Sequence, residues 1–170
     1  MRWLLSSLAL LAVLSMVQPA LAVDSGAPAA PFSLRDLAGQ VHTLDEFKGK
    51  VVVLSFWATW CGPCQVEMPH LQAMYQELGP KGLVILGISA DDAKTVSGVR
   101  PIVASKKLTY PILLDTDTKV VALYNPQKTL PYTVVVGRDG KVAEVHAGYT
   151  PGDEVKLKEK LVALLAVAAP

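Results

Sequence analysis

The sequence contains few cysteines and few charges. Only two cysteines occur in 170 residues, Cys61 and Cys64, so the chain alone can form neither a disulfide-rich scaffold nor a four-thiolate zinc site. Charged residues make up 18% of the chain and the formal net charge is +1, with no basic stripe and no acidic tail. We therefore expect no nucleic-acid partner and no partner recruited mainly by charge. The sequence shows no internal repeat, and its length suits one domain.

Apolar residues are abundant, at 51%, and part of them belongs to the N-terminus. Arg2 is followed by an apolar run over 3–17 and then by Ala20-Leu21-Ala22. A positive start, a short apolar stretch and an Ala-x-Ala ending predict a secretory signal over 1–22. As a helix the run would reach about 22 Å, short of a hydrocarbon core of about 30 Å. The alternative is an uncleaved N-terminal membrane anchor. In either case we expect the domain outside the cytoplasm, in the periplasm.

After the signal, segment 23–31 is rich in small residues and proline, which indicates a tether. The domain is expected over 32–168. Two continuous apolar runs, 51–57 and 83–89, are typical of strands buried on both faces of a parallel sheet. Between them, apolar residues recur at helical spacing over 61–78. This strand–helix–strand order predicts a right-handed parallel unit.

The rest of the domain shows weaker patterns. A small hairpin is expected over 32–44 as a lid on the main sheet. A second hairpin is expected over 133–146, around an Asp-Gly turn. The last helix is expected to start at Thr150 as N-cap, with Pro151 in its first turn. The predicted fold class is therefore α/β, one domain with a central mixed sheet flanked by helices. The remaining expected elements are a helix over 91–107, a strand over 110–114 and a short helix over 118–124.

The two cysteines lie in Trp60-Cys61-Gly62-Pro63-Cys64, where the first buried strand meets the first helix. Two thiols at this spacing can close a small disulfide ring. Cys61 would lie at the helix N-terminus, where free N–H groups and the helix dipole stabilise a thiolate and lower its pKa. The thiolate is the species that attacks disulfides, and Cys64 could then attack the mixed disulfide from inside. This arrangement indicates redox chemistry.

Other uses of the cysteine pair fit less well. So short a loop would stabilise the fold little as a structural disulfide. A zinc site needs two more ligands, and the three histidines are scattered. A peroxiredoxin-like peroxide reductase is an alternative enzyme, but the pattern Pro-x-x-x-Thr/Ser-x-x-Cys fails at Leu54 and Ala58. A copper(I)-binding metallochaperone is a non-catalytic alternative, without a methionine or histidine cluster to support it.

Three segments resemble the thioredoxin superfamily, and more closely its TlpA/ResA branch of membrane-tethered or periplasmic thiol–disulfide oxidoreductases. These are 56–64 (FWATWCGPC), 67–69 (EMP) and 130–133 (LPYT). The resemblance implies a thioredoxin-like fold with an N-terminal β-hairpin and a helix–strand insertion over 91–114. It also implies that Cys61 is the nucleophile, Cys64 the resolving thiol and Pro131 a cis-proline, with Pro69 bending the active-site helix.

The sequence departs from thioredoxin proper at one position. Thioredoxin carries a buried aspartate two residues before the tryptophan of its Phe-Trp-Ala motif, and here that residue is Ser55, which cannot act as a base. Glu67 lies three residues after Cys64, so the two are neighbours on a helix. A carboxylate near a thiol can take or return its proton, and a glutamate at this position resembles such a group in the TlpA/ResA branch. Glu67 is therefore the candidate proton acceptor.

The resemblance further implies an activity and partners. The expected activity is thiol–disulfide exchange with protein disulfides, as a reductant, because Gly-Pro between the cysteines resembles thioredoxin. The implied partners are protein clients, with apocytochrome c as one candidate, and a membrane thiol electron donor. Neither a cofactor nor a metal is expected. The residues expected to contact a client are Trp60, Leu130 and Tyr132.

Overall fold

The computed structural model describes residues 25–168, and these form one mixed sheet of strand order β2-β1-β5-β4-β3-β6-β7. Strands β3, β4 and β5 are parallel, and the other neighbouring pairs are antiparallel. This confirms the predicted α/β class with a mixed sheet. The strands are β1 (Ser33–Asp36), β2 (Val41–Thr43), β3 (Val51–Trp57), β4 (Leu83–Ser89), β5 (Ile112–Leu114), β6 (Tyr132–Val136) and β7 (Val142–Ala147).

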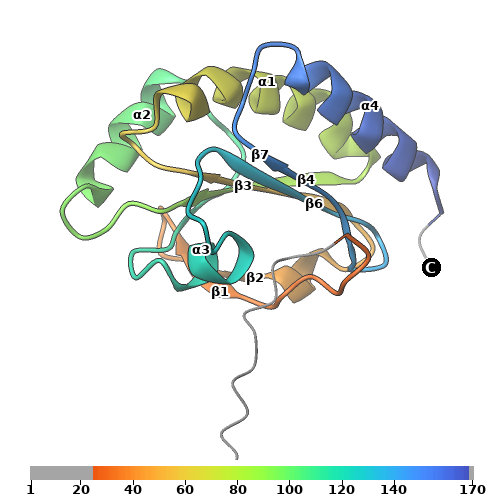
Figure 1. Ribbon diagram of the computed structural model, residues 1–170, viewed down its shortest axis with the longest axis horizontal. Coiled ribbons are helices and arrows are strands. Elements are labelled where there is room, and N and C mark those ends of the chain that lie inside the picture. The colour runs from red at the N-terminus through yellow and green to blue at the C-terminus, as the bar shows by residue number, and fades with distance from the viewer. Residues whose placement is uncertain (1–24, 169–170) are drawn as a thin grey trace, which may run out of the picture.

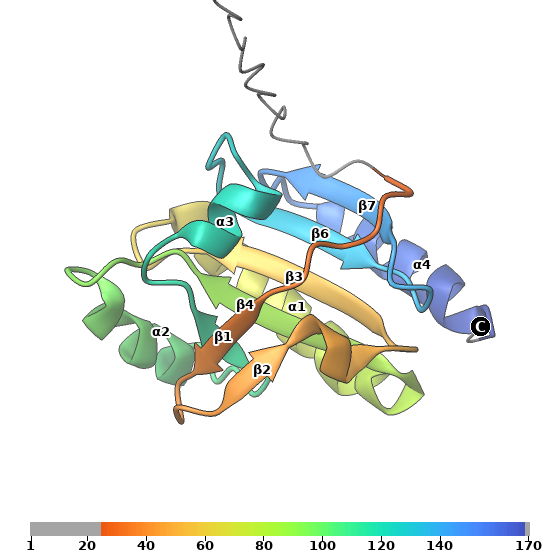
Figure 2. The same ribbon diagram turned by 90° about the horizontal axis from the view of Figure 1, so that it is seen from below.

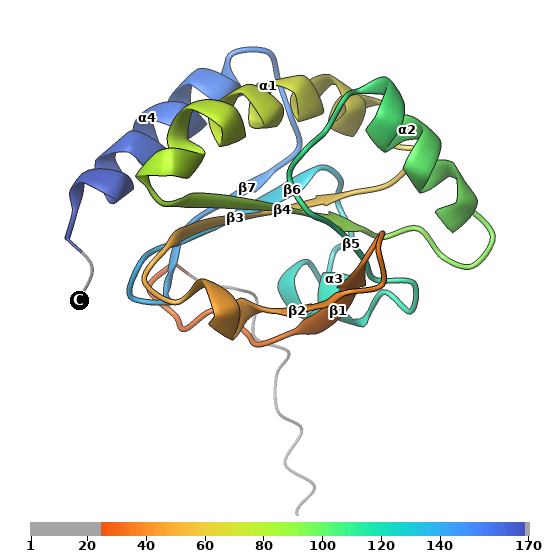
Figure 3. The ribbon, with the colours of Figure 1, turned by 180° about the vertical axis from the view of Figure 1, so that it is seen from behind.

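Helices cover one face of the sheet, and a hairpin with one short helix covers the other (Figures 1 and 3). The first face buries a core that includes the cysteines, Trp57 and Leu161. The second face buries Phe32, Phe56 and Tyr124, beneath β1, β2 and α3, which lie across the sheet in Figure 2. The helices are α1 (Gly62–Leu78), α2 (Val99–Ser105), α3 (Lys119–Tyr124) and α4 (Asp153–Ala166), with 3-10 turns η1 (Leu44–Phe47), η2 (Gly79–Lys81) and η3 (Val96–Gly98).

The central parallel unit follows directly from the sequence. All seven residues of β3 are buried, because cores on both faces of the sheet take its side chains. The predicted strands at 51–57 and 83–89 and the helix that joins them are confirmed. In the parallel register, Trp57 lies opposite Ser89. Consequently the chain segments that leave β3 and β4 begin side by side, at the edge where α1 starts.

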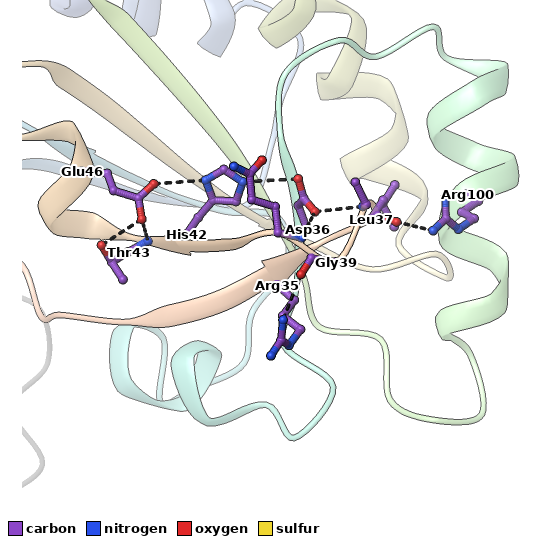
Figure 4. A network of polar contacts seen from close by, with 10 residues as sticks. Arg35, Asp36, Leu37, Gly39, His42, Thr43, Glu46 and Arg100 are labelled. Carbon is purple, nitrogen blue, oxygen red and sulfur yellow. Dashed lines mark hydrogen bonds and ion pairs between the residues drawn. The ribbon is translucent and has the colours of Figure 1, made fainter.

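The N-terminal hairpin does more than cover the sheet as a lid. Strand β1 also pairs with β5, so the hairpin continues the sheet. His42 lies between two carboxylates, with its Nε2 3.3 Å from Asp36 and its Nδ1 3.3 Å from Glu46 (Figure 4). The Arg100 side chain of α2 donates a hydrogen bond to the carbonyl of Leu37. The hairpin is thereby fixed to an element of the opposite layer.

The segment expected to be a tether is attached to the domain over the part that the structure describes. The N–H of Gly26 donates to the carbonyl of Val142 at 2.8 Å, and that of Ala29 to Gly140 at 2.9 Å. Residues 25–30 therefore run along the β6–β7 hairpin instead of forming a free linker. The expected signal over 1–22 lies outside the described residues. Within them, no helix is long and apolar enough to span a membrane.

Helix α4 begins later than its sequence predicts. Its N-cap is Gly152, in the left-handed region at φ 106°, and not Thr150. Thr150 and Pro151 belong to a turn, in which Asp153 Oδ2 accepts the N–H of Thr150 at 2.8 Å. A glycine adopts such a φ at little cost, and this favours the later start. The expected helix over 91–107 is also shorter, since α2 begins only at Val99.

Candidate active site: a disulfide at the start of α1

Cys61 and Cys64 form a disulfide at the junction of β3 and α1, with their Cα atoms 5.4 Å apart. Cys61 is the N-cap of α1, in extended backbone conformation, and Pro63 falls in the first turn. Proline suits this position because an N–H there would lack a helical partner. The sequence thus forms a short ring that needs no distortion of the helix.

The two sulfurs differ in their surroundings. The N–H of Cys64 points at Cys61 Sγ, at 3.3 Å, so the sulfur of Cys61 replaces the missing helical acceptor. A negative charge on Cys61 would be stabilised by this N–H and by the helix dipole. Both cysteines are nearly buried, Cys61 being 4% and Cys64 1% exposed, and Cys64 lies one turn into the helix. Cys61 therefore has the features of an attacking thiolate, and Cys64 those of an internal thiol.

Glu67 lies on α1 one turn beyond Cys64, and its side chain is only 5% exposed. Its Oε1 accepts a hydrogen bond from the Thr133 hydroxyl at 3.3 Å. The pKa of Glu67 is raised from 4.5 to about 7 in total: burial raises it most, the Thr133 hydrogen bond lowers it, and the charge of Asp153 raises it. At neutral pH this carboxyl is therefore near the midpoint of its titration, which suits a group that must both accept and release a proton.

Ser55 of β3 and Glu67 of α1 both lie next to Thr133 of β6. Ser55 lies directly opposite Thr133 in the β3–β6 pair, and both residues face α1. Since Thr133 also binds the Glu67 carboxylate, that carboxylate lies over the row in which Ser55 sits. A helix here supplies a carboxylate to the region where thioredoxin proper carries its strand aspartate. The proton-acceptor interpretation of Glu67 gains a geometric basis from this placement.

Sequence reasoning missed a second buried carboxylate, Asp91. It is fully buried just past the end of β4. Its Oδ2 accepts the N–H of Thr59 at 3.0 Å, and its Oδ1 accepts the Thr59 hydroxyl at 2.6 Å. The Ser89 hydroxyl donates to Oδ2 at 2.9 Å. On the other side, Gln65 Nε2 donates to the Thr59 carbonyl at 2.9 Å. The loop that leads into Cys61 is therefore held at both its N–H and its C=O.

The residues expected to contact clients lie in different places. Trp60 is 66% exposed next to the disulfide. Leu130 is half-buried against the core that includes both cysteines, and the bond from Leu130 to Pro131 is cis, as the resemblance implied. Tyr132 does not join them through its side chain. It packs on the opposite face of the sheet, 6.3 Å from the Phe56 ring centroid.

A cavity of about 150 Å³ lies behind Glu67, between α1, β7 and α4. Thr133 and Glu67 line its inner end, while Glu144, His146 and Asp153 line it from β7 and α4. Among residues 25–168, no three His, Cys, Asp or Glu side chains are grouped so that they could hold a metal ion. The cysteine pair and Glu67 offer the chemistry of a thiol pair with a buried carboxyl one turn along the same helix.

A redox-active cysteine pair at the N-terminus of a helix, on a mixed sheet of this topology, defines a thiol–disulfide oxidoreductase with a thioredoxin-like fold. Residues 25–145 match the AhpC/TSA family. The chain is 34% identical, over 135 residues, to the thiol-disulfide oxidoreductase ResA of Geobacillus thermodenitrificans, an alignment that covers 79% of this chain and 76% of that protein. This protein belongs to the AhpC/TSA family and is a thiol–disulfide oxidoreductase related to ResA.

Solved structures agree with this assignment. A crystal structure of a thiol:disulfide interchange protein DsbE from Chlorobium tepidum matches with a TM-score of 0.79 and 29% identity, covering 85% of this chain and all of that one. A secreted Mycobacterium tuberculosis disulfide oxidoreductase, homologous to E. coli DsbE, matches with a TM-score of 0.69 and 25% identity, covering 78% and 96%. The thioredoxin-like fold that the sequence resemblance implied is confirmed.

Proposed function

We propose that this enzyme is an extracytoplasmic reductant of protein disulfides, in which Glu67 handles the proton of the resolving thiol. The observation that carries the proposal is the burial of Glu67 one turn from Cys64, which brings its pKa to about 7. A glutamate exposed to water on a helix would remain ionised at pH 7 and would be a poor proton carrier. A carboxyl that titrates near neutrality exchanges its proton readily during turnover.

The reaction starts from the reduced enzyme. The Cys61 thiolate attacks a client disulfide, so that a Cys61–client disulfide forms and one client sulfur leaves as a thiolate. Glu67 then takes the proton of Cys64. The Cys64 thiolate attacks Cys61 Sγ, the Cys61–Cys64 disulfide forms, and the second client sulfur leaves. The client has gained two electrons, its two thiolates take up protons from solvent, and the enzyme is left in the disulfide form that the structure contains.

Client binding would use the surface around the disulfide. Trp60 offers an exposed aromatic side chain beside Cys61. Pro131 has no N–H to donate, and the backbone of Leu130 next to it is available to pair with an extended client strand. Tyr132 lies in β6 between β3 and β7, opposite Phe56 and Ala147, and its side chain lies on the other face of the sheet. We therefore leave Tyr132 out of the proposed client contacts and assign them to Trp60, Leu130 and Pro131.

The direction of electron flow is supported by the residues between the cysteines. Gly62-Pro63 resembles thioredoxin, whose couple is strongly reducing at about −270 mV. An enzyme of such potential outside the cytoplasm requires a membrane thiol electron donor to reduce it again. A fitting client is an apocytochrome c whose haem-binding cysteines must be kept reduced.

The compartment is proposed from the N-terminal sequence and from a relative. The signal pattern over 1–22 predicts export and a mature N-terminus at Val23. One structural relative is a secreted disulfide oxidoreductase. Mass spectrometry of the protein from its own cells should find chains that start at Val23. A full-length species in the membrane fraction would instead establish a tethered enzyme facing the periplasm.

The proposed function is tested by trapping clients in the native compartment. A Cys64→Ala variant retains the attack by Cys61 but cannot release the client. It should accumulate covalent complexes that disappear on addition of reductant, and mass spectrometry of these complexes should identify the clients. Cys61→Ala is the matched control, because it retains one cysteine and the same fold but lacks the attacking thiolate.

The trapping result and two further assays distinguish the alternatives. Apocytochrome c or its assembly factors among the trapped proteins would support the maturation role, while a broad set would indicate a general reductase. Equal trapping by both variants would contradict the assigned order of the thiols. Peroxide consumption by the reduced protein tests the peroxiredoxin-like alternative, and copper(I) titration against a double-serine variant tests the metallochaperone alternative.

A further inference from the structure

Glu67 needs a route for its proton while a client covers the active-site surface. Once Glu67 has accepted the proton of Cys64, it can return that proton to the Cys64 thiolate before the thiolate attacks, so client release is fastest when the proton leaves Glu67 within the same turnover. At this stage the client covers the surface around Cys61. The 150 Å³ cavity beside Glu67 is large enough to hold water, its lining includes both polar and apolar side chains, and neither the cysteines nor the residues assigned to client contact line it. It therefore offers a path that stays open during turnover.

The path has an ordered set of side chains. The Thr133 hydroxyl binds Glu67 at 3.3 Å at the inner end of the cavity. His146 lies directly opposite Thr133 in the β6–β7 pair, so their side chains are neighbours on the same face. His146 Nε2 is 3.2 Å from Asp153 Oδ2 at the start of α4. The His146 side chain is 43% exposed, which places it at the boundary between the cavity and solvent.

Other titratable groups also face Glu67 or its cavity. From α1 comes His70, which stacks on Tyr149 at 6.2 Å between ring centroids. The hydroxyl of Tyr149 donates to Glu154 at 2.8 Å, and this pair lies on the outer side. Tyr110 faces Glu67 from the β5 side, and its pKa is raised by burial and by the charge of Glu67. The remaining charged groups that line the cavity are Glu144 and Lys156.

Among these groups, His146 alone combines an imidazole with adjacency to Thr133. Imidazole is the side chain that gains and loses a proton most readily near neutral pH. His70 lies on α1 and stacks on a tyrosine, without a place in the row that joins Thr133 to β7. Asp153 fixes one nitrogen of His146, which leaves the other free to exchange a proton. Tyrosines with raised pKa values hold their protons at this pH.

We propose that His146, oriented by Asp153, relays protons between Glu67 and solvent through the cavity between α1, β7 and α4. The inference rests on the proposed role of Glu67. In each reductive turnover, protonated Glu67 passes its proton through Thr133 and cavity water to the imidazole of His146, which releases a proton to solvent. Glu67 returns to the carboxylate and no electrons move in this step. His146 is a proton-relay residue that acts through Glu67 and does not touch the sulfurs.

The relay is tested by single-turnover kinetics at pH 7 in weak buffer. Reduced enzyme is mixed with a fluorescent peptide that carries one internal disulfide, and acid quenching resolves formation of the mixed disulfide from release of the peptide. His146→Ala should leave formation unchanged and slow release by roughly tenfold, a modest part of what general acid–base groups contribute. Added imidazole should restore the release rate, because it is a base that can enter the enlarged cavity.

Two controls isolate the relay from structural effects. His42→Ala removes another histidine that is paired with carboxylates, on the opposite layer of the fold, and should release the peptide at the wild-type rate. Pyrazole has the size of imidazole but is a far weaker base, so it should not restore release in His146→Ala. If His146→Ala releases the peptide at the wild-type rate, the proposed relay is wrong. The relay is also wrong if release is slow and neither imidazole nor pyrazole restores it, or if both restore it equally.

Failure of the relay and failure of the proposed function give different results. Glu67→Gln should release the peptide slowly with or without imidazole, because the group that receives the proton from Cys64 is gone. If Glu67→Gln releases at the wild-type rate, the role proposed for Glu67 is wrong. If Glu67→Gln is slow while His146→Ala is not, only the relay is wrong and protons reach solvent from Glu67 by another path.

Discussion

Asp91 and Thr59 occupy equivalent positions two residues past the ends of neighbouring parallel strands, and the carboxylate of one binds the N–H and the hydroxyl of the other. Thr59 in turn lies two residues before Cys61. The contact therefore fixes the path of the chain where it enters the redox ring. A buried carboxylate with three donors stabilises this loop only while all its donors stay in place.

Thr59→Val should test how much this contact contributes. The substitution keeps the shape of the side chain but removes the hydroxyl that donates to Asp91 at 2.6 Å. Loss of a hydrogen bond to a buried carboxylate should lower the free energy of unfolding by about 2 kcal/mol. Urea denaturation of the disulfide form measures this, together with Asp91→Asn and the double variant. Because the two residues share one contact, their effects should be less than additive.

Thr95→Val is the matched control for that cycle. Thr95 also donates its hydroxyl to an aspartate, Asp92, but at 3.4 Å and in an exposed position. We expect a loss of less than about 0.5 kcal/mol, as for other surface substitutions. Equal losses at positions 59 and 95, or strictly additive effects of Thr59→Val and Asp91→Asn, would contradict a specific role for the buried contact.

The strands at the centre of the fold could be predicted from the sequence, because a run of apolar residues over 51–57 or 83–89 has one stable place, inside a parallel sheet. The role of Asp91 could have been found in the same way. Each residue of β3 lies opposite the β4 residue whose number is higher by 32. Applied beyond the strand ends, the same offset places Thr59 opposite Asp91, because parallel strands end at the same edge of the sheet. The pattern was in the sequence, but it required the register to be applied beyond the strand ends.

Other features could not be predicted because they depend on distant elements. The burial of Glu67 arises from β6, β7 and α4, which fold over α1 from the far end of the chain. The pairing of His146 with Asp153 depends on how the turn before α4 is formed. Local spacing on one helix shows that Glu67 neighbours Cys64, but not that its carboxyl is removed from water.

Gly98→Ala should destabilise the enzyme and disturb its active-site loop. A Cβ atom at position 98 would lie 3.2 Å from Thr59 Cγ2, and Thr59 is held in place by Asp91. We expect the free energy of unfolding to fall by about 1 kcal/mol, in the range of small overpacking effects.

Gly79→Ala is the matched control, since a Cβ there meets nothing within 4 Å and the backbone is helical. It should stabilise the fold by about 0.5 kcal/mol in thermal or urea unfolding. A stable Gly98→Ala variant would show that Thr59 can move.

Glu67 should make the fold less stable as pH rises. Its pKa is about 7 in the folded protein and near 4.5 when the chain is unfolded, so the folded state binds the proton more tightly. The stability that this group contributes is therefore fully present below about pH 4.5 and is lost as pH rises through 7. The difference corresponds to about 3 kcal/mol. Glu67→Gln lacks this titration, so the wild-type protein minus the variant should show that decline in urea denaturation. A constant difference from pH 4 to pH 8 would place Glu67 in contact with water.

The pH dependence of client release should follow the ionisation of Glu67. Only the carboxylate form can accept the proton of Cys64, so release by the wild-type enzyme should increase through pH 7, the pKa of Glu67. In Glu67→Gln the thiol must ionise unaided, and the increase should move toward the range of an ordinary cysteine, about 8.5. At pH 7 the variant should then be slower by roughly tenfold, since each pH step below a pKa reduces the ionised fraction tenfold. Glu77→Gln is the control and should retain the wild-type profile. Glu77 is an exposed residue on the same helix, and its carboxylate pairs with Lys158 at 2.7 Å. Stopped-flow reduction of a disulfide peptide between pH 5 and pH 9 measures the release rates of all three proteins. Superimposable profiles for wild-type and Glu67→Gln would return Glu67 to a structural role and leave Cys64 to lose its proton directly to water.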